Sequence, residues 1–148
     1  MMKYANVLLK VATLHGVLIG LYHIILPYQW GWSRFTQDLP PIIEWSLFAL
    51  NLFFSVLLIL LTLLGGMVYS FLDIAGRLSK MILLAIASFW AIDIGYQLLN
   101  PVPAPQVYWY IKPLFLGAAI LNFGMYVVVF WSFMLRSNVS KLKINFVR

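Results

Sequence analysis

Four long apolar runs constrain this chain more than any other feature. They are Ala5–Leu26, Ile42–Leu64, Met81–Leu99 and Leu114–Leu135. A helix needs about 20 apolar residues to cross the hydrocarbon core of a bilayer, and each run is apolar around most of its circumference, unlike the surface helix of a soluble protein. The alternating pattern of outer-membrane strands does not occur. The sequence therefore predicts an all-α polytopic membrane protein: a bundle of four transmembrane helices that forms a single integral membrane domain over residues 1–148.

The composition excludes several other classes of protein. Apolar residues make up 64% of the chain and charged residues only 9%, whereas a soluble domain has about 25% charged residues. Such a chain is neither a soluble globule nor a disordered segment. It has no cysteine, which excludes disulfides, thiolate metal sites and thiol redox chemistry. The net charge is +6, but the cations form no single basic face, so we expect a lipid bilayer and no nucleic acid as partner.

The cations indicate how the chain is oriented. Of the ten Lys and Arg residues, only Arg34 and Lys112 fall on one side of the four runs. The others fall on the opposite side: Lys3, Lys10, Arg77, Lys80, Arg136, Lys141, Lys143 and Arg148. The positive-inside rule then predicts that both termini are cytoplasmic, in a multi-pass protein of the cell membrane (the inner membrane of a Gram-negative cell). No small-residue cleavage site follows the first run, so we expect that run to remain as an anchor.

Prolines and glycines mark the expected helix ends. All seven prolines lie in the two outer loops or at their edges, and proline is tolerated only in the first turn of a helix. On the inner side, Gly65 and Gly66 predict a stop to the second helix. In the inner loop that follows, Asp73 and Arg77 have the i, i+4 spacing of an ion pair.

Ionisable and amide side chains inside the runs are the candidate functional residues, because polar groups in hydrocarbon are costly. From the helical rise of 1.5 Å per residue, four of them fall within about two turns of the outer helix ends. These form the predicted polar pocket, open to the outside: His23, Glu44, Asp93 and Gln97. Three further residues are secondary candidates: His15, Asn51 and Asn122.

Each candidate has a functional and a structural interpretation. A histidine near two carboxylates can shuttle protons, bind a cationic or hydroxylated ligand, or hold a metal. Glu44, however, is in the first turn of its helix, where the helix dipole stabilises a carboxylate, and the asparagines suit hydrogen bonds between helices. Asp93 has no such explanation within its own helix, although Asp near a helix centre costs about 2.5–3.5 kcal/mol.

Small residues recur every four positions on two of the runs. Gly16 and Gly20 do so on the first, and Ala91 and Gly95 on the third. Such stripes let helix backbones approach closely. The spacing predicts helix contact, either within the chain or between subunits.

Metal and cofactor sites are not expected. Both histidines lie on one helix, so they cannot ligate one haem iron from opposite faces without a symmetric dimer or a methionine. The spacings of zinc and di-iron sites, phosphate loops and nucleophile elbows do not occur in the runs.

Several segments suggest a family resemblance. The two histidines of the first helix are followed by LPYQWGW (Leu26–Trp32), FALNLFF (Phe48–Phe54) and FWAIDIGYQLLNPVPAP (Phe89–Pro105). In these the chain resembles small four-helix bacterial inner-membrane proteins of the DoxX-like kind. The resemblance implies the same topology and little about chemistry. The chain is also similar in size to small multidrug-resistance antiporters, but its first helix lacks their buried carboxylate.

We therefore expect a protein that acts by binding or assembly, as an accessory subunit of a larger membrane complex or as a homo-oligomer, without chemistry of its own. The alternative is a proton-coupled small-molecule transporter or a ligand-binding membrane enzyme that uses the polar pocket.

Overall fold

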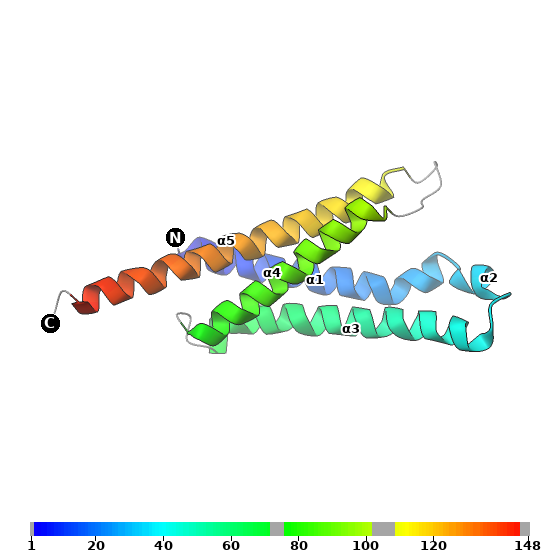
Figure 1. The fold of residues 1–148 in the computed structure, drawn as a ribbon, viewed down its shortest axis with the longest axis horizontal. Coiled ribbons are helices and arrows are strands. Elements are labelled where there is room, and N and C mark those ends of the chain that lie inside the picture. Colours follow the sequence, from blue (N-terminus) through cyan, green and yellow to red (C-terminus); the bar gives the residue numbers. More distant parts are fainter. Residues whose placement is uncertain (1, 72–75, 102–108, 146–148) are drawn as a thin grey trace.

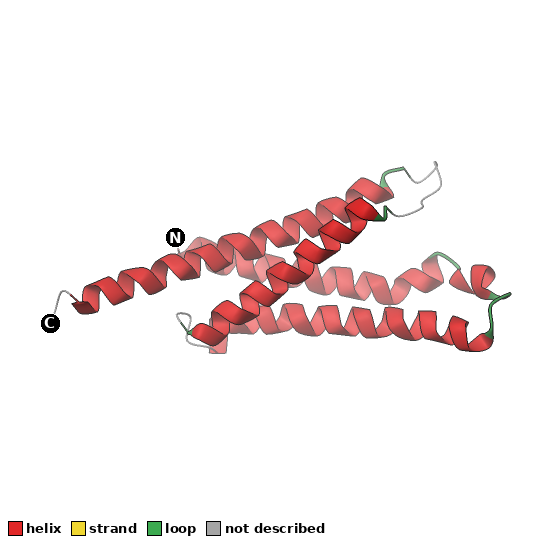
Figure 2. Ribbon diagram, viewed as in Figure 1, coloured by secondary structure: helices red, strands yellow, loops and turns green. Residues whose placement is uncertain are grey.

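The computed structural model describes residues 2–71, 76–101 and 109–145, and this part of the chain is helical without a strand (Figure 2). Its helices are α1 (Met2–Gln29), α2 (Trp32–Thr36), α3 (Pro41–Phe71), α4 (Arg77–Leu99) and α5 (Ile111–Asn145). Four of them contain stretches long and apolar enough to cross a membrane: Tyr4–Gln29, Pro41–Val68, Arg77–Leu99 and Ile111–Leu135. The prediction of an all-α, four-span membrane protein is confirmed.

The four long helices form two hairpins. Helix α1 packs along α3 and α4 packs along α5, while α1 also contacts α5 (Figure 1). Helix α4 starts beside the end of α3 and runs away from it, so that its last turns lie beside α5. We call the end of the bundle that holds α2 the α2 end (right in Figure 1). The opposite end, where α1 starts and α5 finishes, is the terminal end.

The apolar core is concentrated in the middle and towards the terminal end. Leu9 of α1, Leu58 of α3, Leu83 of α4 and Val129 of α5 are each at most 1% exposed and belong to one cluster. Because lipid tails are as apolar as these side chains, close van der Waals packing holds them together here more than the exclusion of water does.

Helix α3 does not stop at Gly65–Gly66, so that prediction is wrong; it continues to Phe71. A Cβ at Gly65 would come within 2.6 Å of the Ile86 side chain, and a Cβ at Gly66 within 2.9 Å of the Thr13 hydroxyl. The two glycines therefore serve close approach of neighbouring helices. With tertiary contacts on both sides, they remain helical despite their poor intrinsic propensity.

Other helix ends also differ from the sequence prediction. Helix α1 continues past Pro27 to Gln29. Proline lacks only its own N–H donor, and the Trp30 N–H that follows still donates to the Leu26 carbonyl oxygen. Helix α2 was not predicted. It follows Gly31, whose φ of 59° is left-handed and costs glycine nothing. Helix α5 extends beyond the predicted run to Asn145. The predicted Asp73–Arg77 pair lies partly outside the described residues.

Candidate functional site

Asp93 and Gln97 of the predicted pocket lie together on α4. The Gln97 side-chain Nε2 donates a hydrogen bond of 2.9 Å to Asp93 Oδ2. The two residues are one turn apart and both are half-buried. Gln97 thus supplies one N–H donor to the carboxylate from within the same helix, and the pair does not join α4 to another helix.

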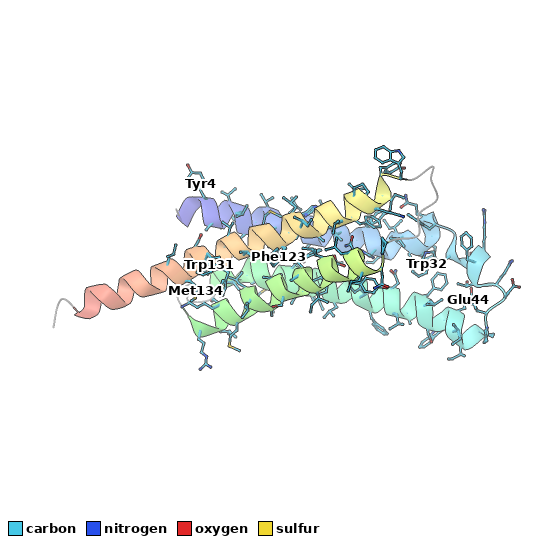
Figure 3. The ribbon with its side chains drawn as sticks, turned by 45° about the horizontal axis from the view of Figure 1, so that its top comes forward. Tyr4, Trp32, Glu44, Phe123, Trp131 and Met134 are labelled. Atoms are coloured by element: carbon cyan, nitrogen blue, oxygen red, sulfur yellow. The ribbon has the colours of Figure 1, made fainter. Side chains whose placement is uncertain are left out.

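Glu44 is at the α2 end, in the first turn of α3 (Figure 3). Its Oε1 accepts a hydrogen bond of 2.7 Å from the Thr36 hydroxyl, and Thr36 is buried in α2. A second contact joins the same two helices, since the rings of Trp32 and Phe48 meet edge to face with centroids 6.0 Å apart. Glu44 therefore ties the short helix α2 to the start of α3, and its carboxylate also lies where the α3 dipole favours negative charge.

His23 packs among aromatic rings. Its imidazole meets Phe54 of α3 edge to face at 5.1 Å, and Phe54 stacks on Phe89 of α4 at 6.0 Å. Its backbone carbonyl accepts a 2.7 Å hydrogen bond from the Asn51 side chain. This aromatic row and the Asn51 bond connect α1 and α3 near the α2 end, and the Phe54–Phe89 contact continues the row to α4.

These contacts decide which candidates come together. Asp93 meets Gln97, Glu44 meets Thr36, and His23 meets Phe54. Within residues 2–71, 76–101 and 109–145, no hydrogen bond or ion pair joins His23, Glu44 and Asp93, and no three His, Asp or Glu side chains gather as a metal site would require. A pocket lined by all four residues stays a prediction.

The secondary candidates His15 and Asn122 form a pair in the middle of the bundle. Asn122 Nδ2 lies 2.7 Å from His15 Nδ1 and 3.3 Å from the Ala118 carbonyl oxygen. The Asn122 amide and the His15 imidazole are thus hydrogen-bonded to each other across the two helices. Asn122 is fully buried, so this hydrogen bond fastens α5 to α1 inside the membrane.

The buried polar atoms without a hydrogen-bond partner among the described residues include Asn122 Oδ1 and Trp90 Nε1. A buried polar atom without a hydrogen bond is uncommon in proteins, because it loses its bonds to water without replacing them.

The glycines and alanines of the two predicted stripes have different surroundings. A Cβ at Gly16 would collide with the side chain of Thr62, and one at Gly20 with that of Ile59. These two glycines therefore let α1 and α3 approach closely. On α4, by contrast, Ala91 is exposed and a Cβ at Gly95 would meet nothing within 4 Å.

Sequence reasoning missed two hollows between α4 and α5. One, of about 290 Å³, is at the α2 end and is lined by Gln97, Leu98, Pro101, Lys112, Pro113 and Leu116. The other, of about 250 Å³, is nearer the terminal end, and its lining includes Leu84, Ala87, Ala91, Phe123, Phe130 and Trp131. Phe123 and Trp131 are labelled in Figure 3. No spacing in the sequence indicates which faces of α4 and α5 leave space between them.

The chain matches no protein-family model, no curated protein and no solved structure. The resemblance to DoxX-like proteins stays a prediction, and the proposals below rest on the residues themselves.

Proposed function

We propose that this protein acts by binding and assembly within the bilayer, as an accessory subunit of a larger membrane complex or as a homo-oligomer. We propose that it lies in the cell membrane, which is the inner membrane in a Gram-negative cell. Both termini are then cytoplasmic, as the distribution of Lys and Arg predicts. The observation that carries the proposal is a face of α5 that has close-packing residues but no packing partner within the described chain.

That face contains Gly117 and Gly124. They are seven residues apart and so lie on the same side of the helix, and a Cβ at either would meet nothing within 4 Å. A glycine inside a helix is less favourable than alanine by about 0.5–1 kcal/mol. In membrane proteins such residues permit the close approach of another helix, and Gly16, Gly20, Gly65 and Gly66 do this within the chain.

The polar residues of the spans support the same proposal. Three of their hydrogen bonds join different helices: His15 with Asn122, Asn51 with the His23 carbonyl, and Glu44 with Thr36. Side chains engaged in this way hold the helices in place, as a scaffold for a partner requires.

Cysteine crosslinking tests the proposal, because the natural chain has no cysteine. In native membranes we expect Gly124→Cys to form a crosslinked adduct whose mass identifies a second copy or another membrane protein. Leu14→Cys is the matched control, since Leu14 is 62% exposed on α1, away from this face. Gly124→Leu should abolish the adduct of a Gly117→Cys chain without unfolding it. If neither Gly117→Cys nor Gly124→Cys gives a crosslinked adduct and both chains remain monomeric, the proposal is overturned.

A second candidate function rests on Asp93. Its carboxylate lies half-buried within a span and accepts a hydrogen bond from Gln97 but has no cationic partner among the described residues. An ionisable side chain inside a span often marks a proton or substrate pathway. A proton-coupled transporter would acidify proteoliposomes under an imposed pH gradient, and Asp93→Asn would stop it. Equal proton flux in both proteins and in empty vesicles would eliminate proton movement through Asp93 by itself.

A further inference from the structure

The two hollows between α4 and α5 lie on the same side of this hairpin, and we call the seam along which they lie the groove. Ala91 in one hollow and Leu98 in the other are seven residues apart, so they lie on the same face of α4. Phe123 and Leu116 are related in the same way on α5. The hollows therefore follow a single seam along the α4–α5 hairpin, from the α2 end towards the terminal end.

The groove is amphipathic along its length. At its α2 end lies Lys112, which is exposed and makes no hydrogen bond or ion pair with the rest of the described chain. Lys112 is in the first turn of α5, where the helix dipole adds positive potential. The nearest carboxylate on α4, that of Asp93, is one turn below the groove mouth and accepts its hydrogen bond from Gln97. Below the mouth the lining is mainly apolar.

The length of the groove fits a lipid that lies in one leaflet. From Lys112 to Phe123 the rise along α5 is about 16 Å, close to half of the hydrocarbon thickness of about 30 Å. A lipid whose headgroup lies at Lys112 would thus have its acyl chain in the leaflet nearer the α2 end. An acyl chain is a single file of methylenes and can lie along the seam between two helices packed side by side.

We propose that this groove is a binding site for one anionic lipid. The lipid phosphate binds the Lys112 ammonium beside the Gln97 amide, and one acyl chain runs between Leu98 and Leu116 towards Ala91 and Phe123. The site goes beyond the proposed assembly function and does not depend on it, since Gly117 and Gly124 lie about 100° away around α5 from Leu116 and Phe123.

Native mass spectrometry of the detergent-purified protein with added phosphatidylglycerol or phosphatidylcholine tests the site. We expect a one-to-one adduct with phosphatidylglycerol, stronger than with phosphatidylcholine. Lys112→Gln should weaken the phosphatidylglycerol adduct by about fivefold, as expected for one cation at a lipid surface, and should leave phosphatidylcholine binding unchanged. Arg34→Gln is the matched control, because Arg34 is an exposed cation at the same end of the bundle but outside the groove.

Filling the groove tests its apolar part. Leu116→Trp should reduce adducts of both lipids, while Gly124→Leu should reduce neither. If Leu116→Trp does not fold, the Lys112 and Arg34 comparison still decides. Equal loss of phosphatidylglycerol in both charge variants would overturn the proposal. So would a dimer that replaces the lipid adduct and disappears in Lys112→Gln, because the groove would then hold a second copy.

Discussion

The two ends of this bundle are built differently. Towards the terminal end, side chains such as Leu9, Val68 and Leu83 are at most 1% exposed, and glycines bring the helices into close contact. At the α2 end, Trp45, Leu99 and Trp109 are 65%, 82% and 72% exposed. The polar residues there make short local ties, Glu44 to Thr36 and Asp93 to Gln97. Close packing joins the two hairpins at one end. At the other, Glu44 and Thr36 tie α2 to α3, while the Asp93–Gln97 bond stays within α4.

The largest expected effect comes from breaking the closely packed region. Gly16→Leu would drive a side chain into Thr62 and separate α1 from α3, so we expect a loss of about 3 kcal/mol in the free energy of unfolding, at the upper end for overpacking. Unfolding in mixed micelles measures it. Gly95→Leu is the matched control and should change stability by less than about 0.5 kcal/mol, because Gly95 has open space around it. Similar losses in both would remove the distinction between the two stripes.

The next largest loss of stability is expected from breaking the hydrogen bond between Asn122 and His15 inside the bundle. Asn122→Ala removes the hydrogen-bond partner of His15 and leaves a cavity, so we expect a loss of about 2 kcal/mol in the free energy of unfolding. A double-mutant cycle with His15→Ala isolates the pair itself, for which we expect a coupling of about 0.6–1.7 kcal/mol. A coupling of zero would mean that the pair does not fasten α5 to α1.

At the α2 end the expected effect is local. Thr36→Val removes the hydroxyl that donates to Glu44 at nearly constant volume, and we expect a cost of about 1 kcal/mol. Hydrogen exchange should become faster in α2 and in the first turn of α3, and remain unchanged in the core around Leu83. Faster exchange throughout the bundle would show that the α2 end is coupled to the core after all.

The smallest effect is expected at the α4 pair. Asp93→Asn keeps the shape of the side chain and its partner Gln97 is on the same helix, so we expect a change in stability below about 0.5 kcal/mol. Thermal unfolding of the purified protein measures it. A loss as large as that of Asn122→Ala would mean that Asp93 holds another helix in place.

The sequence predicted the helices better than their contacts. Hydropathy is read along the chain, so the four spans follow from it directly. The end of α3 does not follow from hydropathy, because Gly65 and Gly66 remain helical only through contacts with Ile86 and Thr13. Similarly, His15 and Asn122 are visible as polar residues, but their pairing joins positions 107 apart in sequence. Local patterns carry no information on that pairing.

The continuation of α5 beyond its membrane-spanning stretch has a mechanical consequence. Its membrane-spanning stretch ends at Leu135, but the helix continues to Asn145, about 15 Å farther at the helical rise, and it projects past the other helices in Figure 1. The helix has no break between the two parts. Any rotation or tilt of α5 within the bilayer therefore turns the projecting segment through the same angle.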